Sequence, residues 1–279
     1  MTAERSTLAS PELGTMVTAG GIRTNVHDAG SGAPVLLIHG SGPGVSAWAN
    51  WRFAIPRLAS RLRVIAPDIV GFGYTDPPES FKYSLSQWRD HLLAVLDALG
   101  VQKASVVGNS FGGALALSLA AAEPARVDRL VLMGSVGVQF PLTSELDAIW
   151  GYEPSLDNMR ALMHTFAYDQ TIVNDELVRL RYEASTRRET RDAYAEMFPA
   201  PRQSGIDALC LPEDSIRALP HRTLLIHGRD DRVIPMQTSL RLLELIPKSE
   251  LHIYGNCGHW VQIERSGEFV DLVARFLTA

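Results

Sequence analysis

The chain has 279 residues, 46% of them hydrophobic, which is enough to bury one large core with a smaller domain set upon it. Its formal net charge of -5 and its lack of a basic cluster exclude a general nucleic-acid-binding surface. The cysteines, Cys210 and Cys257, are too few for a disulfide framework and lack metal-ligand spacing, so we expect a reducing compartment and no metal site.

The first residues, MTAERSTLASPELG, show neither the basic nor the apolar stretch of a signal peptide. No apolar run approaches the roughly 18 residues that span a bilayer. We therefore expect a flexible leader to about residue 12, no membrane anchor and a cytoplasmic location.

Short apolar runs alternate with helical patterns along most of the chain, which is typical of a mostly parallel sheet covered by helices. In chain order we predict strands at 24–28, 34–40 and 63–68, a helix at 84–100, a strand at 103–109, a helix at 111–122, strands at 129–135, 223–228 and 250–255, and a helix at 267–277. Ser84 or Ser86 is the expected N-cap of the first helix, and Gly100 its end.

The alternation stops between Gly137 and Leu219, where helical patterns occur without a convincing strand. We predict an all-helical lid domain, 139–219, inserted after a strand of an α/β core formed by 1–138 and 220–279. We expect the large apolar side chains of the lid to form its own core, with one or two facing a pocket: Phe140, Trp150, Met159, Met163, Phe166, Met197 and Phe198.

The stretch GNSFG matches G-x-S-x-G, the nucleophile elbow, in which a sharp strand-to-helix turn projects the hydroxyl of Ser110. The bare pattern occurs by chance in roughly one such chain in ten, so the interpretation of Ser110 as a nucleophile depends on the secondary structure around it. A predicted strand comes before it and a predicted helix after it, as the elbow requires. The helix N-terminus also directs N–H groups toward any oxyanion formed beside Ser110.

A serine hydroxyl needs an oriented base to become a nucleophile at neutral pH. His259 follows the last predicted strand, in GNCGHW, where a loop over the carboxyl edge of the sheet would hold it. His39 and His227 end predicted strands and are also placed near this edge. His91 and His252 have the surroundings of structural histidines.

The acid that orients the base is expected in HGRDDRVIP, which follows another predicted strand and offers Asp230 and Asp231. The chain order Ser110, Asp231, His259 is that of the α/β-hydrolase triad. We favour Asp231, as hydrolases of this type usually place the acid three residues after a glycine and four before a proline. Asp230 stays the alternative.

The stretch HGSGPGVSAWANW follows an early strand, where these enzymes place their second oxyanion donor. Backbone N–H groups of Ser41 or Gly42, with that of Phe111, would stabilise an oxyanion. The glycines here do not fit G-x-G-x-x-G, and no Gly-Lys-Ser or Gly-Lys-Thr follows, which argues against a nucleotide site.

At these residues the chain resembles the meta-cleavage product hydrolases, which cleave a carbon–carbon bond after extradiol ring opening in bacterial breakdown of aromatic compounds. The resemblance runs from about Thr24 to the C-terminus and rests on LLIHGSGPGVSAWANWR, GNSFGGALALSLA, LVLMGSVG and NCGHWVQIE. The predicted lid resembles the branch for single-ring substrates, 2-hydroxymuconic semialdehyde and its alkyl ketone relatives, through WGYEPSLDNMR, IVNDELVRLRYEAS and MFPAPRQ.

The resemblance implies an α/β-hydrolase fold, no cofactor, a homodimer or larger homo-oligomer, and a 2-hydroxy-6-oxohexa-2,4-dienoate substrate. It also implies that Arg187 clamps the substrate carboxylate in two hydrogen bonds, although the adjacent Arg188 is an alternative. The further binding residues that it implies are Ser41, Gly42, Asn50, Asn109 and Trp260.

Two other functions are compatible with the same residues. The first is a carboxylesterase or lactonase using the same triad, and the second is a non-catalytic receptor for a small ligand. The substituent at the far ketone, from hydrogen through methyl to isopropyl, stays open, because one methylene changes specificity by only about 1 to 3 kcal/mol. Attack by Ser110 and attack by water are also both open.

Overall fold

The computed structural model describes residues 11–279, so the expected leader lies almost wholly outside the described residues. Eight strands form one sheet in the order β1-β2-β4-β3-β5-β6-β7-β8. The first two pairings, β1 with β2 and β2 with β4, are antiparallel, and the others are parallel. The strands are β1 (Thr15–Ala19), β2 (Ile22–Ala29), β3 (Pro34–Ile38), β4 (Arg63–Pro67), β5 (Ala104–Asn109), β6 (Val127–Met133), β7 (Arg222–Gly228) and β8 (Ser249–Tyr254).

The central strands are buried on both faces, which explains their continuous apolar sequences. Every residue of β5 is buried, and its side chains alternate between the two faces of the sheet. Val106 belongs to the core on one face and Val107 to the core on the other. The seven predicted strands and the α/β class are confirmed, whereas β1 was not predicted because its residues are mostly exposed and form no apolar run.

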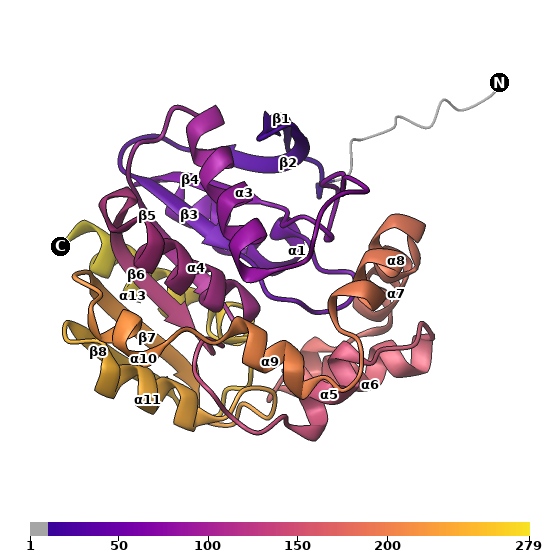
Figure 1. Ribbon diagram of the computed structural model, residues 1–279. Helices are drawn as coiled ribbons and strands as arrows, with labels where there is room; N and C mark the ends of the chain where they lie inside the picture. The colour runs from indigo at the N-terminus through magenta and orange to yellow at the C-terminus, as the bar shows by residue number, and fades with distance from the viewer. Residues whose placement is uncertain (1–10) are drawn as a thin grey trace.

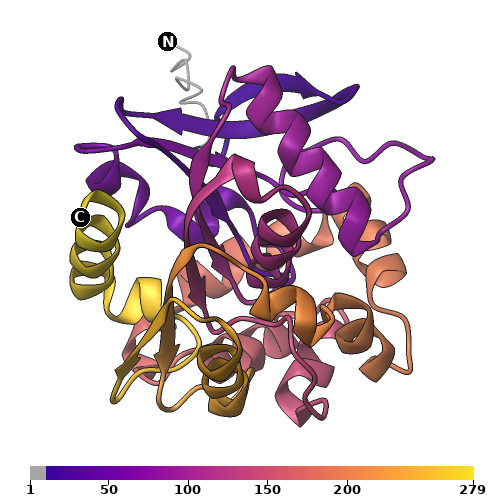
Figure 2. The same ribbon diagram turned by 60° about the vertical axis from the view of Figure 1, so that its left-hand side comes forward.

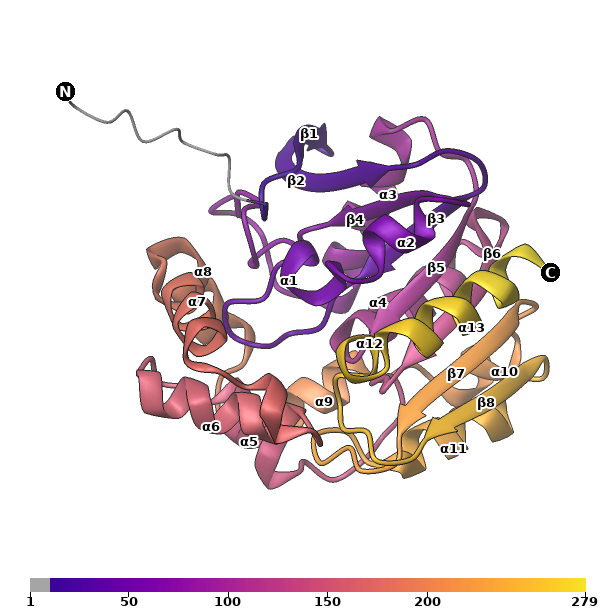
Figure 3. The same cartoon turned by 180° about the vertical axis from the view of Figure 1, so that it is seen from behind.

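Helices cover both faces of the sheet, as Figures 1 and 3 show from opposite sides. On one face lie α1 (Ala47–Trp51), α2 (Ile55–Leu58), α12 (Val261–Glu264) and α13 (Ser266–Thr278); on the other lie α3 (Leu85–Ala98), α4 (Phe111–Ala122) and α11 (Met236–Leu245). Figure 2 shows α13, in yellow, on the opposite side of the sheet from α3. No helix within residues 11–279 is both long and apolar enough to cross a bilayer.

The predicted helix caps are found in α3. Ser84 is its N-cap and accepts a hydrogen bond from the Gln87 amide at 3.4 Å. Gly100 follows the helix at φ +69°, a left-handed conformation that a glycine adopts at little cost. Both ends of this helix are therefore determined by residues at or next to its termini.

The segment between β6 and β7 is helical, as predicted, and its helices are α5 (Ser144–Trp150), α6 (Leu156–Phe166), α7 (Asp175–Thr186), α8 (Arg188–Met197), α9 (Gln203–Leu209) and α10 (Glu213–Arg217). Figures 1 and 3 show α5 to α8 grouped at the end of the sheet toward which the parallel strands point. The last helix, α10, packs against α4 and α11, so the end of the predicted lid 139–219 lies with the core helices.

Candidate active site

Ser110 occupies a strained turn between β5 and α4. Its backbone has φ 55° and ψ -117°, a conformation that non-glycine residues rarely adopt. A Cβ atom on Gly108 would lie 2.4 Å from the Gly112 carbonyl oxygen, so this crossing of strand and helix requires glycine. The Ser110 amide donates to the Met133 carbonyl at 2.8 Å, which holds the turn against β6. The elbow geometry is the one that the sequence predicts.

Asp231 and His259 form a buried hydrogen-bonded pair. Asp231 Oδ2 lies 2.7 Å from His259 Nδ1, and Asp231 Oδ1 accepts from the Val233 and Ile234 amides at 2.8 and 3.0 Å. Burial by itself raises the pKa of Asp231, but the attraction and hydrogen bond of His259, with the Ile234 amide, hold that pKa below its usual value. Asp230 turns instead toward Arg229.

Ser110 and His259 face one small cavity of about 20 Å³, room for about one water molecule. Other side chains that line it are Ser41, Val45, Asn50, Asn109, Leu146, Ile149, Phe166, Arg181, Val233 and Trp260, together with Gly40 and Gly42. Within residues 11–279 no hydrogen bond joins Ser110 Oγ to the imidazole. Such catalytic bonds are often long until a substrate binds.

Two of the expected oxyanion donors, Ser41 and Gly42, line this cavity, and the third, Phe111, directly follows Ser110. Phe111 is the first residue of α4, so its N–H has no acceptor within the helix. Its ring lies in the core, 4.8 Å from that of Trp88 in an edge-on contact. Ser41 and Gly42 follow β3, and Trp150 Nε1 of α5 donates to Ser41 Oγ at 3.0 Å. The lid therefore holds the oxyanion loop directly.

Arg187, the expected carboxylate clamp, lies outside this cavity. Its guanidinium stacks over the ring of Tyr74 at 4.0 Å and donates to the Gly73 carbonyl at 2.9 Å. The side chain of Arg188, the alternative, is 85% exposed. Both arginines stand at the junction of α7 and α8, which packs beside the Gly73 turn and not over Ser110. Neither arginine therefore lines the cavity that contains Ser110, where the expected carboxylate clamp would lie.

Arg181 of α7 is the arginine that reaches the cavity. It shares a helix face with Val178 and Ser185, the buried residues of α7, at spacings of three and four residues. Its Nη1 donates to the Gly44 carbonyl at 3.0 Å, and within residues 11–279 it forms no ion pair. Burial lowers its pKa to about 10, so it stays a cation at neutral pH and is suited to an anionic ligand.

Aromatic and amide side chains complete the wall. Phe166, the last residue of α6, stacks on Trp260 at 5.0 Å and on His259 at 5.9 Å, and its carbonyl accepts from the His259 amide at 2.8 Å. Asn50 Nδ2 has no hydrogen-bond partner among residues 11–279, whereas Asn109 Nδ2 donates weakly to the Met133 carbonyl at 3.4 Å. Phe166 belongs to the set of large apolar lid residues of which one or two were expected to face a pocket, and it lines this cavity.

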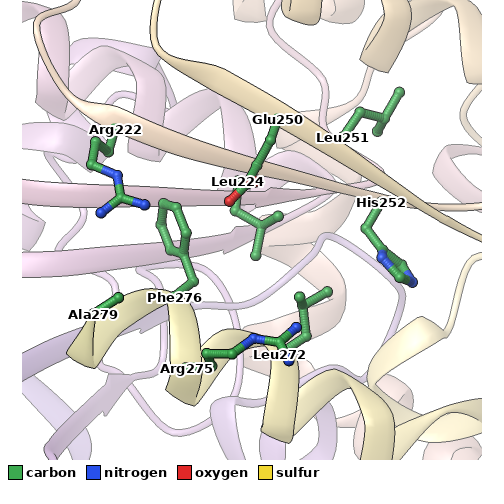
Figure 4. A pocket seen from close by; sticks show the side chains of 9 residues that line it. All are labelled: Arg222, Leu224, Glu250, Leu251, His252, Leu272, Arg275, Phe276 and Ala279. Atoms are coloured by element: carbon green, nitrogen blue, oxygen red, sulfur yellow. The ribbon is translucent and has the colours of Figure 1, made fainter.

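A larger cavity, of about 380 Å³, lies elsewhere and has different chemistry. Figure 4 shows its lining side chains, which come from β7, β8 and α13 and include Arg222, Glu250 and Arg275. Arg222 begins β7, so this cavity lies at the opposite end of the strand from Asp231 and His259. The residues that line this cavity include no serine and no His–Asp pair. The larger volume of a cavity is therefore no guide to the reactive site.

Comparison with known proteins agrees with this geometry. Residues 33–266 match the α/β-hydrolase fold family. The chain is 58% identical to 2-hydroxy-6-oxo-2,4-heptadienoate hydrolase of Pseudomonas putida, over 98% of this chain and 99% of that protein. It is 56% identical to 2-hydroxymuconate semialdehyde hydrolase of Pseudomonas sp. strain CF600, over 96% and 95% of the two chains. The meta-cleavage product hydrolase CumD of Pseudomonas fluorescens IP01 superposes with a TM-score of 0.95 at 54% identity, covering 96% of this chain and 98% of that one.

Proposed function

The chain belongs to the α/β-hydrolase fold family and, within it, to the meta-cleavage product hydrolases, and from this premise we propose that it hydrolyses a carbon–carbon bond of 2-hydroxy-6-oxohexa-2,4-dienoates. The products are 2-hydroxypenta-2,4-dienoate and a carboxylic acid, which is formate when the substrate is 2-hydroxymuconic semialdehyde. One observation supports the proposal: the elbow serine, His259 of the His–Asp pair and a partly buried arginine, Arg181, line one cavity.

We assign His259 the proton transfers of the reaction. Its Nδ1–H donates to Asp231, which leaves Nε2 as the basic nitrogen on the side of Ser110. The substrate first becomes its keto tautomer, so that the 2-keto group can accept electrons from the bond that breaks. Ser110, or water deprotonated by His259, then attacks the far carbonyl, and the N–H groups of Phe111 and Gly42 stabilise the oxyanion.

The charge distribution of the cavity gives the substrate a direction. Arg181 supplies the cation for the 2-hydroxy acid end, where it binds the carboxylate through charge-assisted hydrogen bonds. Leu146, Ile149 and Val233 supply an apolar end for the substituent at the far carbonyl. Because the cavity is so small, we propose hydrogen or a short alkyl group there, with the lid displaced during binding.

We further propose a cytoplasmic homo-oligomer. Within residues 11–279 the sheet ends at β8, whose outer edge has backbone groups available for pairing with a second copy. Ile253 on this strand is 45% exposed. Sedimentation of the purified protein tests the oligomer, and a monomer at micromolar concentration would contradict it.

Decay of the yellow dienolate tests the proposed activity. The purified protein should bleach 2-hydroxymuconic semialdehyde rapidly, and Ser110→Ala should slow the bleaching greatly. An unchanged colour with rapid cleavage of simple aryl esters would favour an esterase or lactonase. Intact-mass measurement after organophosphate treatment tests the receptor alternative, since a folded protein with an unreactive Ser110 would favour it.

A further inference from the structure

A second histidine lies against the Asp231–His259 pair. His227 of β7 is wholly buried, and its Nε2 lies 3.5 Å from Asp231 Oδ2. The same Nε2 lies 3.0 Å from the Ile234 carbonyl oxygen, and Nδ1 lies 2.7 Å from Ser239 Oγ on α11. The proposed mechanism gives this side chain no part in proton transfer.

The hydrogen-bond partners of His227 determine which of its nitrogens carries the proton. A carbonyl oxygen only accepts hydrogen bonds, so Nε2 must carry the hydrogen that it shares with Ile234. In a neutral ring Nδ1 is then an acceptor, and the Ser239 hydroxyl donates to it. Burial lowers the pKa of His227, which agrees with a neutral ring.

The bond to Ile234 ties His227 to the turn that holds Asp231. The Ile234 amide donates to Asp231 Oδ1 at 3.0 Å, while the Ile234 carbonyl accepts from His227 at 3.0 Å. Both backbone polar groups of Ile234 are thereby bonded, which fixes the turn after β7. The same Nε2 also lies 3.5 Å from Asp231 Oδ2.

We infer that His227 is a positioning residue for Asp231: a neutral, Nε2-protonated imidazole, fixed by Ser239, that holds the Asp231 turn through Ile234. The inference rests on the proposed function, because it acts through the Asp231–His259 pair. The titratable side chains that face Asp231 within residues 11–279 are His227, at 3.5 Å, and His259, at 2.7 Å. A neutral His227 leaves His259 as the cation that this carboxylate stabilises during turnover.

Substitution of His227 tests this role by kinetics. His227→Leu removes the donor and leaves the buried Ile234 carbonyl unpaired, whereas His227→Gln places an amide N–H near the position of Nε2. His91→Leu is the matched control, since His91 of α3 is also buried but bonds to Thr24, away from Asp231. Each variant is assayed on the dienoate from pH 5 to 9, with thermal unfolding recorded in parallel.

The expected losses are specific to the chemical step. His227→Leu should lower kcat about 10- to 100-fold, as loss of an outer hydrogen-bond partner does at metal sites, with KM within about twofold. The acid limb of its kcat/KM profile should move upward, because a carboxylate without this neighbouring N–H stabilises protonated His259 more strongly. His227→Gln should recover most of kcat, and His91→Leu should keep wild-type kinetics.

Three kinetic results would overturn the inference: wild-type kcat in His227→Leu, an unmoved acid limb in that variant, or no recovery in His227→Gln. Nitrogen NMR of the wild-type imidazoles tests it without any variant or any activity. The expected spectrum shows His227 neutral and Nε2-protonated from pH 6 to 8. A protonated or Nδ1-protonated ring would refute the inference even if the dienoate is a substrate, and an inactive wild type with the expected spectrum would refute only the proposed function.

Discussion

Exchange of Arg181 and Arg187 for leucine separates two arginines that the sequence does not distinguish. Arg181 reaches the cavity that contains Ser110, and Arg187 stacks on Tyr74 outside it. Arg181→Leu should therefore impair catalysis of a carboxylate-bearing substrate. Arg187→Leu removes a similar side chain and charge from the same region of the lid, and is the matched control.

The size of the effect follows from the surroundings of Arg181. A guanidinium–carboxylate pair about 4 Å apart, at an effective dielectric constant of about 20, is worth about 4 kcal/mol. Arg181 is partly buried and forms no ion pair within residues 11–279, but the Glu12 carboxylate attracts it and offsets part of this energy. We expect kcat/KM to fall by roughly two to three orders of magnitude, mostly through KM.

Arg181→Lys keeps the charge but loses the forked geometry, so about a tenfold loss is expected. Arg187→Leu should change kcat/KM by less than about threefold, since its contacts with Tyr74 and Gly73 lie outside the cavity that contains Ser110. Initial rates of dienolate decay over a range of substrate concentrations measure all three variants, and circular dichroism checks their folding. A larger loss in Arg187→Leu than in Arg181→Leu would refute the assignment.

Three further predictions concern other parts of the structure. Asp231→Asn should lower kcat roughly 10³- to 10⁴-fold in the dienolate assay, whereas Asp230→Asn should change kcat by less than about threefold. Equal losses of kcat in the two variants would contradict the pairing of Asp231 with His259 at 2.7 Å. Trp150→Phe loses the bond to Ser41 but keeps a ring against Phe198, so kcat/KM should fall about fivefold, and an unchanged value would show that this bond does not position the oxyanion loop. Burial raises the pKa of Asp68 to about 6 despite hydrogen bonds from Ala47 and Asn25, so between pH 4 and 6 folding takes up a proton. The free energy of unfolding should therefore fall by about 2 kcal/mol as pH rises from 4 to 6. Urea unfolding of wild type and Asp68→Asn measures this, and equal slopes in the two proteins would contradict it.

The sheet and the triad could be predicted because their signals are local. Strands such as β5 are buried on both faces and show as apolar runs. Ser110, Asp231 and His259 each follow such a run, and parallel strands bring their carboxyl ends to one edge. The spacing of Asp231 between Gly228 and Pro235 also separated it correctly from Asp230.

The place of Arg181 could not be predicted by the same means, because α7 contains several charged residues. The orientation of α7 depends on how the helix packs on the loop that contains Ser41, Gly42 and Gly44. A helical pattern does contain one usable signal. Arg181 shares a helix face with Val178 and Ser185, which are the buried residues of α7. Arg187 is predicted from the family resemblance alone, and its place in the charged run RRETRD is typical of a solvated helix end.

The role inferred for His227 also depends on tertiary contacts. Sequence places it near the site because it ends a strand, but nothing local shows that its two nitrogens meet Ile234 and Ser239. Those partners come from the turn after β7 and from α11, and their approach is fixed by packing. Side-chain partnerships of this kind follow from the fold and not from spacing.

The most direct test of the whole account is a crystal structure of Ser110→Ala with the dienoate bound. The account predicts the far carbonyl carbon about 3 to 3.5 Å from the position of the missing hydroxyl, beside the Phe111 amide and His259, with the carboxylate on Arg181. A substrate bound in the opposite direction, or outside the cavity between Ser110 and the lid, would contradict it.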